Sequence, residues 1–151
     1  MNALRSAVAL TVSALCCAGC GADVEPHITA SNPVVGAVPG DSAAVYVELE
    51  NSGGDDALIG ATCDCDAEIS LHVTEDLDGI SIMTGADRLD VPTGSTLELD
   101  PGGSHLMVQD LQSPLTAGST IDITLHFERS EDLSVTVPVV PLEDLAERIE
   151  N

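Results

Sequence analysis

Short segments in which apolar and polar residues alternate recur along this chain and constrain its fold more than any other feature. In residues 45–49 and again in residues 121–127, every second residue is apolar. Neighbouring side chains of a β-strand point to opposite faces, so each segment predicts a half-buried strand. The other segments with a strand pattern are residues 58–61, 69–73, 80–83, 89–91, 96–99, 105–108 and 133–137.

Turn-forming residues separate these segments, as in Asn-Ser-Gly-Gly-Asp-Asp at 51–56 and Asp-Pro-Gly-Gly at 100–103. Many short strands with turns between them are typical of a β-sandwich or barrel. Only residues 141–149 have a helical pattern. A chain of 151 residues allows one domain of common size. We therefore expect a single all-β domain that ends in a short helical, acidic tail.

The composition agrees with this class. Hydrophobic residues make up 44 % of the chain, enough for burial to offset chain entropy. Tyr46 and Phe127 are the only Tyr, Phe or Trp residues, so Val, Leu, Ile and Ala must fill the core. A core rich in β-branched residues fits a small β-sandwich.

The charge is strongly negative. There are 26 acidic residues against four Arg, with no Lys, which gives a net charge of −22. Nucleic acid and anionic membrane surfaces are poor partners for such a surface. The acids could form a field that concentrates cations, or they could serve solubility, in a salty habitat for example. Their spread along the whole chain favours solubility.

The first 20 residues predict a signal peptide. Arg5 provides an early positive charge, an apolar run covers residues 7–15, and small residues follow. The apolar run is too short to span a membrane as a helix. The pattern predicts a mature protein that works outside the cytoplasm, in the periplasm or on the outer face of the bacterial membrane.

The end of this leader is Ala18-Gly19-Cys20, which resembles a bacterial lipobox. Cys17 stands where the usual lipobox has Leu, and ordinary cleavage nearby is the alternative. The pattern predicts lipidation of Cys20 and a membrane anchor through that lipid. Residues 21–42 would then form a tether and first strand, residues 43–140 the sandwich, and residues 141–151 the acidic tail.

Cys63 and Cys65 remain in the mature chain, with only Asp64 between them. An oxidising compartment favours a disulfide. On an extended strand, however, residues i and i+2 are too far apart for an ordinary bridge, so a disulfide would need a tight turn. A disulfide, a free dithiol and an accessory soft-metal site all remain open, as does a purely structural role.

Four potential soft-metal ligands form one pattern: His72, Met83, His105 and Met107. Ten residues separate the first two, twenty-one the next two, and one the last two. Each of the four is out of phase with the apolar residues of its strand, so all four should point away from the core. Core methionines would instead be in phase. Two imidazoles and two thioethers suit Cu(I) better than a hard cation or Zn²⁺.

The remaining histidines stand outside this pattern. His126 alternates with apolar residues of its strand and should be exposed, and His27 lies near the start of the mature domain. We expect both to be ordinary surface residues. An accidental arrangement of exposed His and Met is the alternative explanation of the four-residue pattern.

The pattern resembles the signature of the periplasmic copper chaperone family (PCuAC-type proteins). The resemblance extends over residues 43–139 and includes YVELEN at 46–51, Ser-Leu-His at 70–72 and DPGGSHLM at 100–107. It implies a cupredoxin-like Greek-key β-sandwich that binds Cu(I) through His72, Met83, His105 and Met107. It also implies delivery of copper to the binuclear Cu(A) centre of cytochrome c oxidase, with the oxidase subunit or another copper chaperone as protein partner.

Two further function classes compete with a copper carrier. A redox protein could use Cys63 and Cys65 as a thiol–disulfide pair, whereas a blue-copper site is disfavoured because no Cys lies beside His105. A structural surface lipoprotein would explain the leader and the strands but not the four-residue pattern. No catalytic triad or phosphate-binding glycine loop stands out, so we expect no enzyme.

Overall fold

The structure, a computed structural model, describes residues 24–149. The predicted signal peptide, 1–20, and Cys20 lie outside the described residues. The described chain forms β1 Ile28–Ala37, β2 Ala43–Asn51, β3 Asp56–Cys63, β4 Glu68–Leu77, β5 Ile80–Ala86, β6 Leu89–Val91, β7 Thr96–Leu99, β8 Ser104–Gln109, β9 Thr120–Phe127, β10 Leu133–Pro141 and α1 Leu142–Ile149.

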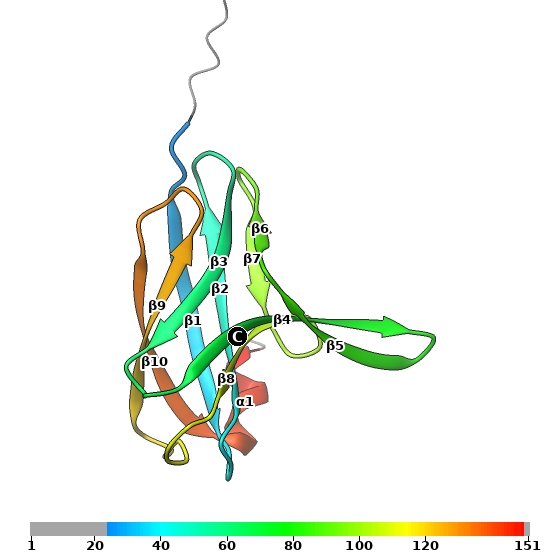
Figure 1. Cartoon of the computed structure of the whole chain (residues 1–151), viewed down its shortest axis with the longest axis vertical. Coiled ribbons are helices and arrows are strands. Elements are labelled where there is room, and N and C mark those ends of the chain that lie inside the picture. The colour runs from blue at the N-terminus through cyan, green and yellow to red at the C-terminus, as the bar shows by residue number, and fades with distance from the viewer. Residues whose placement is uncertain (1–23, 150–151) are drawn as a thin grey trace, which may run out of the picture.

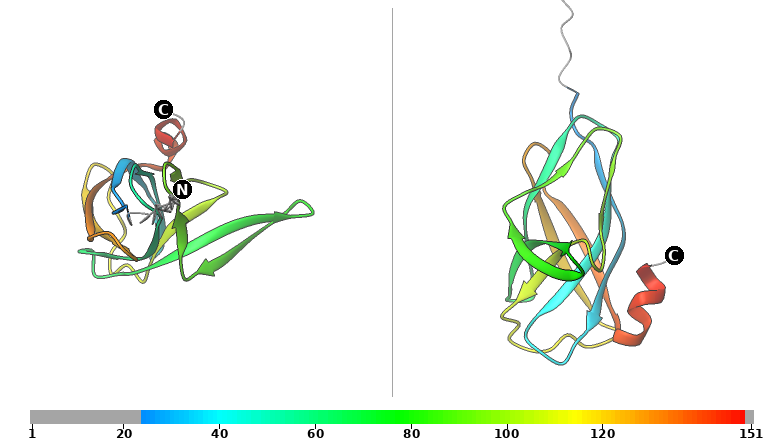
Figure 2. Two further views of the ribbon diagram at one scale, coloured as in Figure 1. Left: turned by 90° about the horizontal axis from the view of Figure 1, so that it is seen from above. Right: turned by 90° about the vertical axis from the view of Figure 1, so that its right-hand side faces the viewer.

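The strands join in the order β5-β4-β8-β7-β2-β1-β10-β9-β3-β6. Among the strands of residues 24–149, only the β1–β10 and β7–β8 pairs are parallel. The sheet folds over into two layers around one core (Figures 1 and 2). The predicted all-β, cupredoxin-like sandwich with a short C-terminal helix is therefore confirmed.

Side chains from both layers fill the core. Leu49 on β2, Leu58 on β3, Leu106 on β8 and Ile123 on β9 are each at most 1 % exposed. In β9, buried and less buried residues alternate along the strand, as the sequence pattern predicts. The apolar positions of each strand thus determine which face packs in the core. The side chains of the opposite face are not needed for core packing.

Two buried polar residues organise one end of the sandwich. Asn51 accepts from the backbone N–H groups of His27 and Gly53, and its amide donates to the carbonyls of Gly54 and Val91. The carboxylate of the second, Asp56, accepts hydrogen bonds from the β9–β10 loop. Buried polar groups of this kind are tolerated because they are paired.

β4 and β5 continue beyond the body of the sandwich as a two-stranded arm (Figure 1). Leu77, Ile80 and Ile82 lie on the arm and are 55 %, 65 % and 42 % exposed. Among the described strands, β5 is also one of the two edge strands of the sheet and pairs with β4 alone. The alternation in residues 80–83 predicts a half-buried strand, but here the apolar face runs past the end of the core.

The C-terminal helix α1 packs on β1. A Cβ atom at Gly36 would lie 3.1 Å from Leu145 Cδ2, so the small residue lets the helix approach the strand closely. Within residues 24–149, no helix is both long and apolar enough to cross a membrane.

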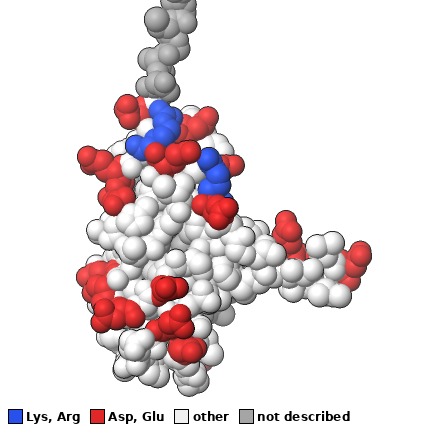
Figure 3. Space-filling view, in the orientation of Figure 1, with Lys and Arg blue, Asp and Glu red and all other residues white. Residues whose placement is uncertain are grey.

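Acidic side chains gather at particular places on the surface. On the face shown in Figure 3 they lie at both ends of the sandwich and on the arm, and the basic side chains seen there lie close to acids. Arg88 is paired with Asp90 and Glu128, at 2.8 and 3.2 Å. Most of the middle of this face is uncharged.

Candidate metal centre

Strand register brings the four His and Met residues to one face of the sheet. His72 on β4 is paired with His105 on β8, and Met107 is paired with Ser70, two residues before His72. On the other side of β4, Met83 of β5 is paired with Thr74, two residues after His72. Residues two apart on a strand share a face. All four side chains therefore leave the same face, with His72 in the middle.

The two imidazoles are direct neighbours. The ring centroids of His72 and His105 are 5.6 Å apart, and the rings are inclined by 59°. A metal ion about 2 Å from a ring nitrogen lies roughly 3 Å from the centroid of that ring. The observed separation is thus compatible with both imidazoles binding one ion.

The two thioethers are diagonal neighbours of His72. Diagonal residues on paired strands are roughly 7–8 Å apart, and their Cβ atoms are somewhat closer, within reach of long side chains. Methionine has three rotatable side-chain bonds and a polarisable sulfur, so its thioether can reach toward a metal ion held between the two imidazole rings. Met107 comes from the body of the sheet, whereas Met83 comes from the arm.

Exposure rises across the four residues. His105 is only 3 % exposed, His72 and Met107 are partly buried, and Met83 is 50 % exposed. The sequence predicts that His105 points away from the core. It does lie opposite the core residue Leu106, but it is buried on its own face, where the rings of Tyr46 and His72 flank it. The centre is therefore closed at His105 and open at Met83.

Each imidazole has one nitrogen in a hydrogen bond and one without a partner. His105 Nδ1 lies 3.3 Å from the carbonyl oxygen of Gly103, and His72 Nε2 lies 3.1 Å from Ser70 Oγ. Among the described residues, His72 Nδ1 and His105 Nε2 are the buried side-chain nitrogen and oxygen atoms left without a partner. Native structures rarely leave such atoms unpaired, so each needs an explanation.

The turn before β8 sets the position of His105. A carbonyl oxygen can only accept, so the Gly103 contact places the His105 proton on Nδ1 and leaves the lone pair on Nε2. A Cβ at Gly103 would lie 2.3 Å from Asp100 Oδ1 and 3.8 Å from the Asp100 carbonyl oxygen. The second glycine of Asp-Pro-Gly-Gly thus leaves room for the Asp100 carboxylate against the turn.

Tyr46 completes the buried side of the centre. Its ring centroid is 6.4 Å from that of His105. Burial raises the pKa of Tyr46, and the nearby Asp100 carboxylate raises it further. The phenol therefore stays neutral and offers no phenolate to a metal at neutral pH.

Other metal-binding chemistry finds no support in the part of the chain that the structure describes. No group of three or more His, Cys, Asp or Glu there is placed to hold a metal ion. His126 is occupied by Thr62 and Asp132, at 3.1 and 3.0 Å, and is half-buried rather than fully exposed. A site built on His72 and His105 therefore depends on the two thioethers.

Cys63 and Cys65 form a disulfide. Cys63 is the last residue of β3, and the chain bends through Asp64 to Asp66, so the pair does not lie on an extended strand. The Cα atoms are 5.2 Å apart, compared with roughly 6.6 Å for residues i and i+2 of a strand. Of the states that the sequence left open, the structure has the disulfide, in which neither sulfur is a thiolate ligand.

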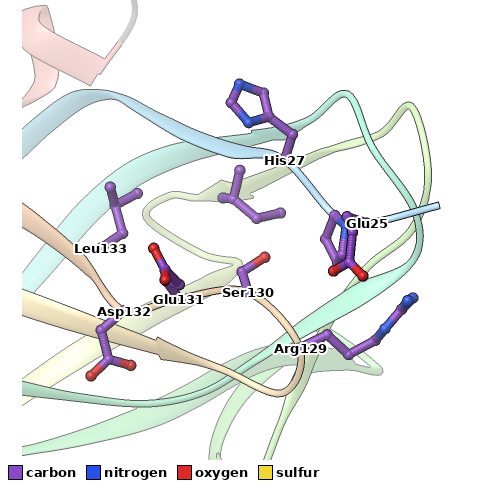
Figure 4. Close-up of a pocket in the computed structure, with 9 residues that line it drawn as sticks. Glu25, His27, Arg129, Ser130, Glu131, Asp132 and Leu133 are labelled. Carbon is purple, nitrogen blue, oxygen red and sulfur yellow. The ribbon is translucent and has the colours of Figure 1, made fainter. Parts of the chain in front are cut away.

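A separate pocket lies where the described chain begins (Figure 4). Its lining includes His27 and residues of the β9–β10 loop, among them Arg129, Glu131 and Asp132. None of the four His and Met residues lines it. We assign it no part in the centre on β4, β5 and β8.

Sequence reasoning missed three neighbours of the centre: Ser70, Gln109 and Tyr46. Ser70 lies two residues before His72 and Gln109 two residues after Met107, so the rule of alternation places them on the ligand face. That signal was present in the sequence. The contact between Tyr46 and His105 needed the β2–β8 pairing, which the sequence does not reveal.

Comparison with known proteins identifies a family. The sequence profile of the family described as "Putative lipoprotein LpqE-like" matches residues 28–139. A protein of Leifsonia xyli subsp. xyli described as "Putative lipoprotein" is 39 % identical over 98 residues, or 64 % of this chain. That match spans 59 % of the length of the Leifsonia protein.

Solved structures agree on the fold. The copper-bound PCuAC domain from PmoF2 has a TM-score of 0.63 at 23 % identity, covering 76 % of this chain and 92 % of that domain. The solution structure of CuI-DR1885 from Deinococcus radiodurans has a TM-score of 0.60 at 30 % identity, covering 75 % of this chain and 76 % of that one. The predicted resemblance to PCuAC-type proteins is thereby confirmed.

Proposed function

Because this chain belongs to the LpqE-like lipoprotein family, we propose that it is an extracytoplasmic carrier of Cu(I). The observation that carries the proposal is the pair of unpartnered buried nitrogens, His72 Nδ1 and His105 Nε2. An imidazole lone pair that is buried without a proton donor is available to a metal ion. Two similar solved structures, those of the PmoF2 domain and DR1885, are a copper-bound and a CuI form, which supports copper as the metal.

The donor set favours Cu(I) over other ions. We propose His72, His105, Met83 and Met107 as its ligands, with the two thioethers on either side of the imidazole pair. Thioethers are soft ligands that suit Cu(I), whereas Zn²⁺ sites use Cys, His and carboxylate. None of the four carries a charge when the imidazoles are neutral. Such a set can bind Cu(I) and release it to a stronger, thiolate-containing site.

The open side of the centre suggests how copper would leave. Met83 is half-exposed on the arm, while His105 is buried. A receiving protein could replace the Met83 thioether first, while the two imidazoles keep hold of the ion. We propose the Cu(A) centre of cytochrome c oxidase, or another copper chaperone, as the receiver. Mixing the Cu(I)-loaded protein with an isolated, metal-free Cu(A) domain and following metal content after separation tests this transfer.

The location is proposed from the leader and the family. Lipidation of Cys20 would anchor the protein to the outer face of the membrane, and the description of its family as "Putative lipoprotein LpqE-like" supports this anchor. Metabolic labelling with a radioactive fatty acid should label the natural chain but not a Cys20→Ala variant. Equal labelling of the two chains would show that Cys20 is not the lipidated residue.

Copper binding itself is tested by titration with Cu(I) against a competing chelator, without oxygen. The combined Met83→Ala and Met107→Ala variant should lose at least about 100-fold in affinity, equal to about 2.7 kcal/mol. The matched control is Ile82→Ala, a neighbour of Met83 that is similarly exposed but points to the opposite face. Unchanged affinity in the methionine variant would overturn the proposal. We expect binding without catalysis.

The disulfide supports a second candidate, a thiol–disulfide protein. Cys63 and Cys65 are half-buried at the end of β3. Reduction by an external dithiol would break the bridge, transfer two electrons and yield two thiols, with the dithiol becoming a disulfide. Incubation with reduced thioredoxin followed by alkylation tests this. Labelling at both cysteines would support the candidate, and its absence would count against it.

A further inference from the structure

We propose that Ser70 and Gln109 are positioning residues that fix the proton of His72 on Nε2 and so leave Nδ1 as the metal-binding atom. The inference rests on the proposed Cu(I) function and adds which atom binds and what holds it in place. Neither residue belongs to the four proposed ligands.

The two residues form a chain of hydrogen bonds that ends on the imidazole. Ser70 Oγ lies 3.0 Å from Gln109 Oε1 and 3.1 Å from His72 Nε2. Ser70 and His72 are two residues apart on β4, so their side chains share a face. Gln109 is paired with Glu68 on the neighbouring strand, so its side chain lies diagonally across from Ser70 on that face.

The direction of this chain follows from proton counting. A serine hydroxyl has one proton and two lone pairs. The amide oxygen of Gln109 can only accept, so the Ser70 proton is used there. Ser70 then offers a lone pair to His72, and His72 Nε2 must supply the proton of the second bond. The neutral ring consequently has its own lone pair on Nδ1, the atom that has no other partner.

The tautomer of His105 is also fixed by a hydrogen bond, in this case to a backbone carbonyl. The Gly103 carbonyl holds its proton on Nδ1, which leaves Nε2 free. The two neighbouring rings therefore present opposite nitrogens, Nδ1 of His72 and Nε2 of His105. Hydrogen-bond partners of metal-binding histidines fix the tautomer and the ring orientation, and their loss typically lowers metal affinity about 10- to 100-fold.

The first test is the tautomer of His72 in the metal-free protein. Two-dimensional NMR that correlates the imidazole nitrogens with the carbon-bound ring protons distinguishes protonated from unprotonated nitrogen at neutral pH. We expect His72 with Nε2 protonated and His105 with Nδ1 protonated. If Gln109 instead presents its N–H₂ group to Ser70, the serine proton points to His72 and the opposite tautomer appears, which overturns the inference.

The second test is Cu(I) affinity in a set of variants. Ser70→Ala removes the acceptor, and we expect a loss of about tenfold or more. Ser70→Thr keeps the hydroxyl and should restore the affinity to near that of the natural chain. Gln109→Leu frees the serine proton, so it should increase the Nδ1-protonated form of His72 and weaken binding. The matched control is Ser31→Ala, which removes another serine–side-chain hydrogen bond, to Glu48 on β2.

The outcomes separate this inference from the proposed function. If the natural chain binds no Cu(I), the proposed function fails, while the NMR result on the metal-free protein still decides the tautomer. If the natural chain binds Cu(I) but Ser70→Ala binds equally well with the same tautomer, Ser70 has no positioning role. An equal loss in Ser70→Thr and Ser70→Ala would likewise overturn it, because the hydroxyl would not be the cause.

Discussion

His72 and His105 face each other across the β4–β8 strand pair, with ring centroids 5.6 Å apart and one unpartnered buried nitrogen on each ring. Side-chain nitrogens buried without a partner lower the stability of a folded protein. Metal binding would explain why the two nitrogens are buried without a partner. The surrounding fold holds the two imidazoles in place, and individual residues of that fold can be tested by substitution.

Asn51 should be among the most sensitive polar positions of the fold. It is fully buried, and its amide satisfies four backbone groups. Asn51→Ala leaves these groups without their partner and should lower the free energy of unfolding by about 3 kcal/mol or more. Urea denaturation measures the change. Gln112→Ala, at an exposed residue with one hydrogen bond, is the control and should change stability little.

Gly103→Ala should displace the Asp100 side chain and leave the turn backbone in place. The new Cβ would lie 2.3 Å from Asp100 Oδ1 but 3.8 Å from the Asp100 carbonyl oxygen, so rotation of the carboxylate relieves the close contact. We expect a loss of about 1 kcal/mol or less in unfolding free energy, measured by urea denaturation, and an unchanged Cu(I) affinity. The control is Gly40→Ala, where a Cβ meets nothing within 4 Å. A much larger loss of stability in Gly103→Ala than in Gly40→Ala, or a weaker Cu(I) affinity, would show that the turn backbone moves.

The Asp56 carboxylate should stabilise the fold at neutral pH, and this contribution should be lost in acid. Burial raises the pKa of Asp56, but hydrogen bonds from Ser130, Ala57 and Arg129 outweigh that effect, and the net pKa is lowered. The contribution is therefore fully present above the ordinary pKa, about 3.9, and is lost as the pH falls through the lowered folded-state value.

The check compares unfolding free energies of the natural chain and Asp56→Asn between neutral and acidic pH. The variant should be less stable at neutral pH, and the difference should shrink on acidification. Asp87→Asn changes an exposed carboxylate and is the control. A difference that stays constant with pH would show that the Asp56 carboxylate charge is not what stabilises this loop.

Salt should stabilise the protein. A net charge of −22 on 151 residues produces self-repulsion in the compact state. Raising NaCl from about 0.01 M to about 1 M shortens the screening length from about 30 Å to about 3 Å. The unfolding temperature should rise over this range. Sodium chloride is preferable to sulfate, because sulfate stabilises folded proteins by exclusion from their surface.

The disulfide should be dispensable for copper. Cys63 and Cys65 already bond each other, and Cys63 is paired with β9, outside the β4–β5–β8 face. A Cys63→Ser and Cys65→Ser double variant should keep the Cu(I) affinity and a stoichiometry of one ion per chain. A clear drop in either measurement would point to the accessory metal role.

The alternation of apolar and polar residues correctly predicted which side chains of a single strand point into the core. In β8, alternation places Leu106 and Val108 in the core and His105 and Met107 on the other face, as the structure has them. The same rule was insufficient for Ile80 and Ile82, because alternation reports a shared face but not where the core ends. It also could not reveal that Tyr46 and His72 bury His105, since this depends on pairing between distant segments.

The position of Met83 gives the arm a thermodynamic role. β5 is held to the protein only through β4, so its backbone hydrogen bonds should open more readily than those of the central strands. Copper bound by Met83 together with His72 and His105 would have to be released from Met83 before β5 could separate. By linkage, bound copper should then raise the free energy of opening β5 by the amount that Met83 contributes to the affinity, and amide hydrogen exchange in β5 should slow accordingly. The exchange rates of one edge strand would thus measure the share of the copper affinity that comes from the arm.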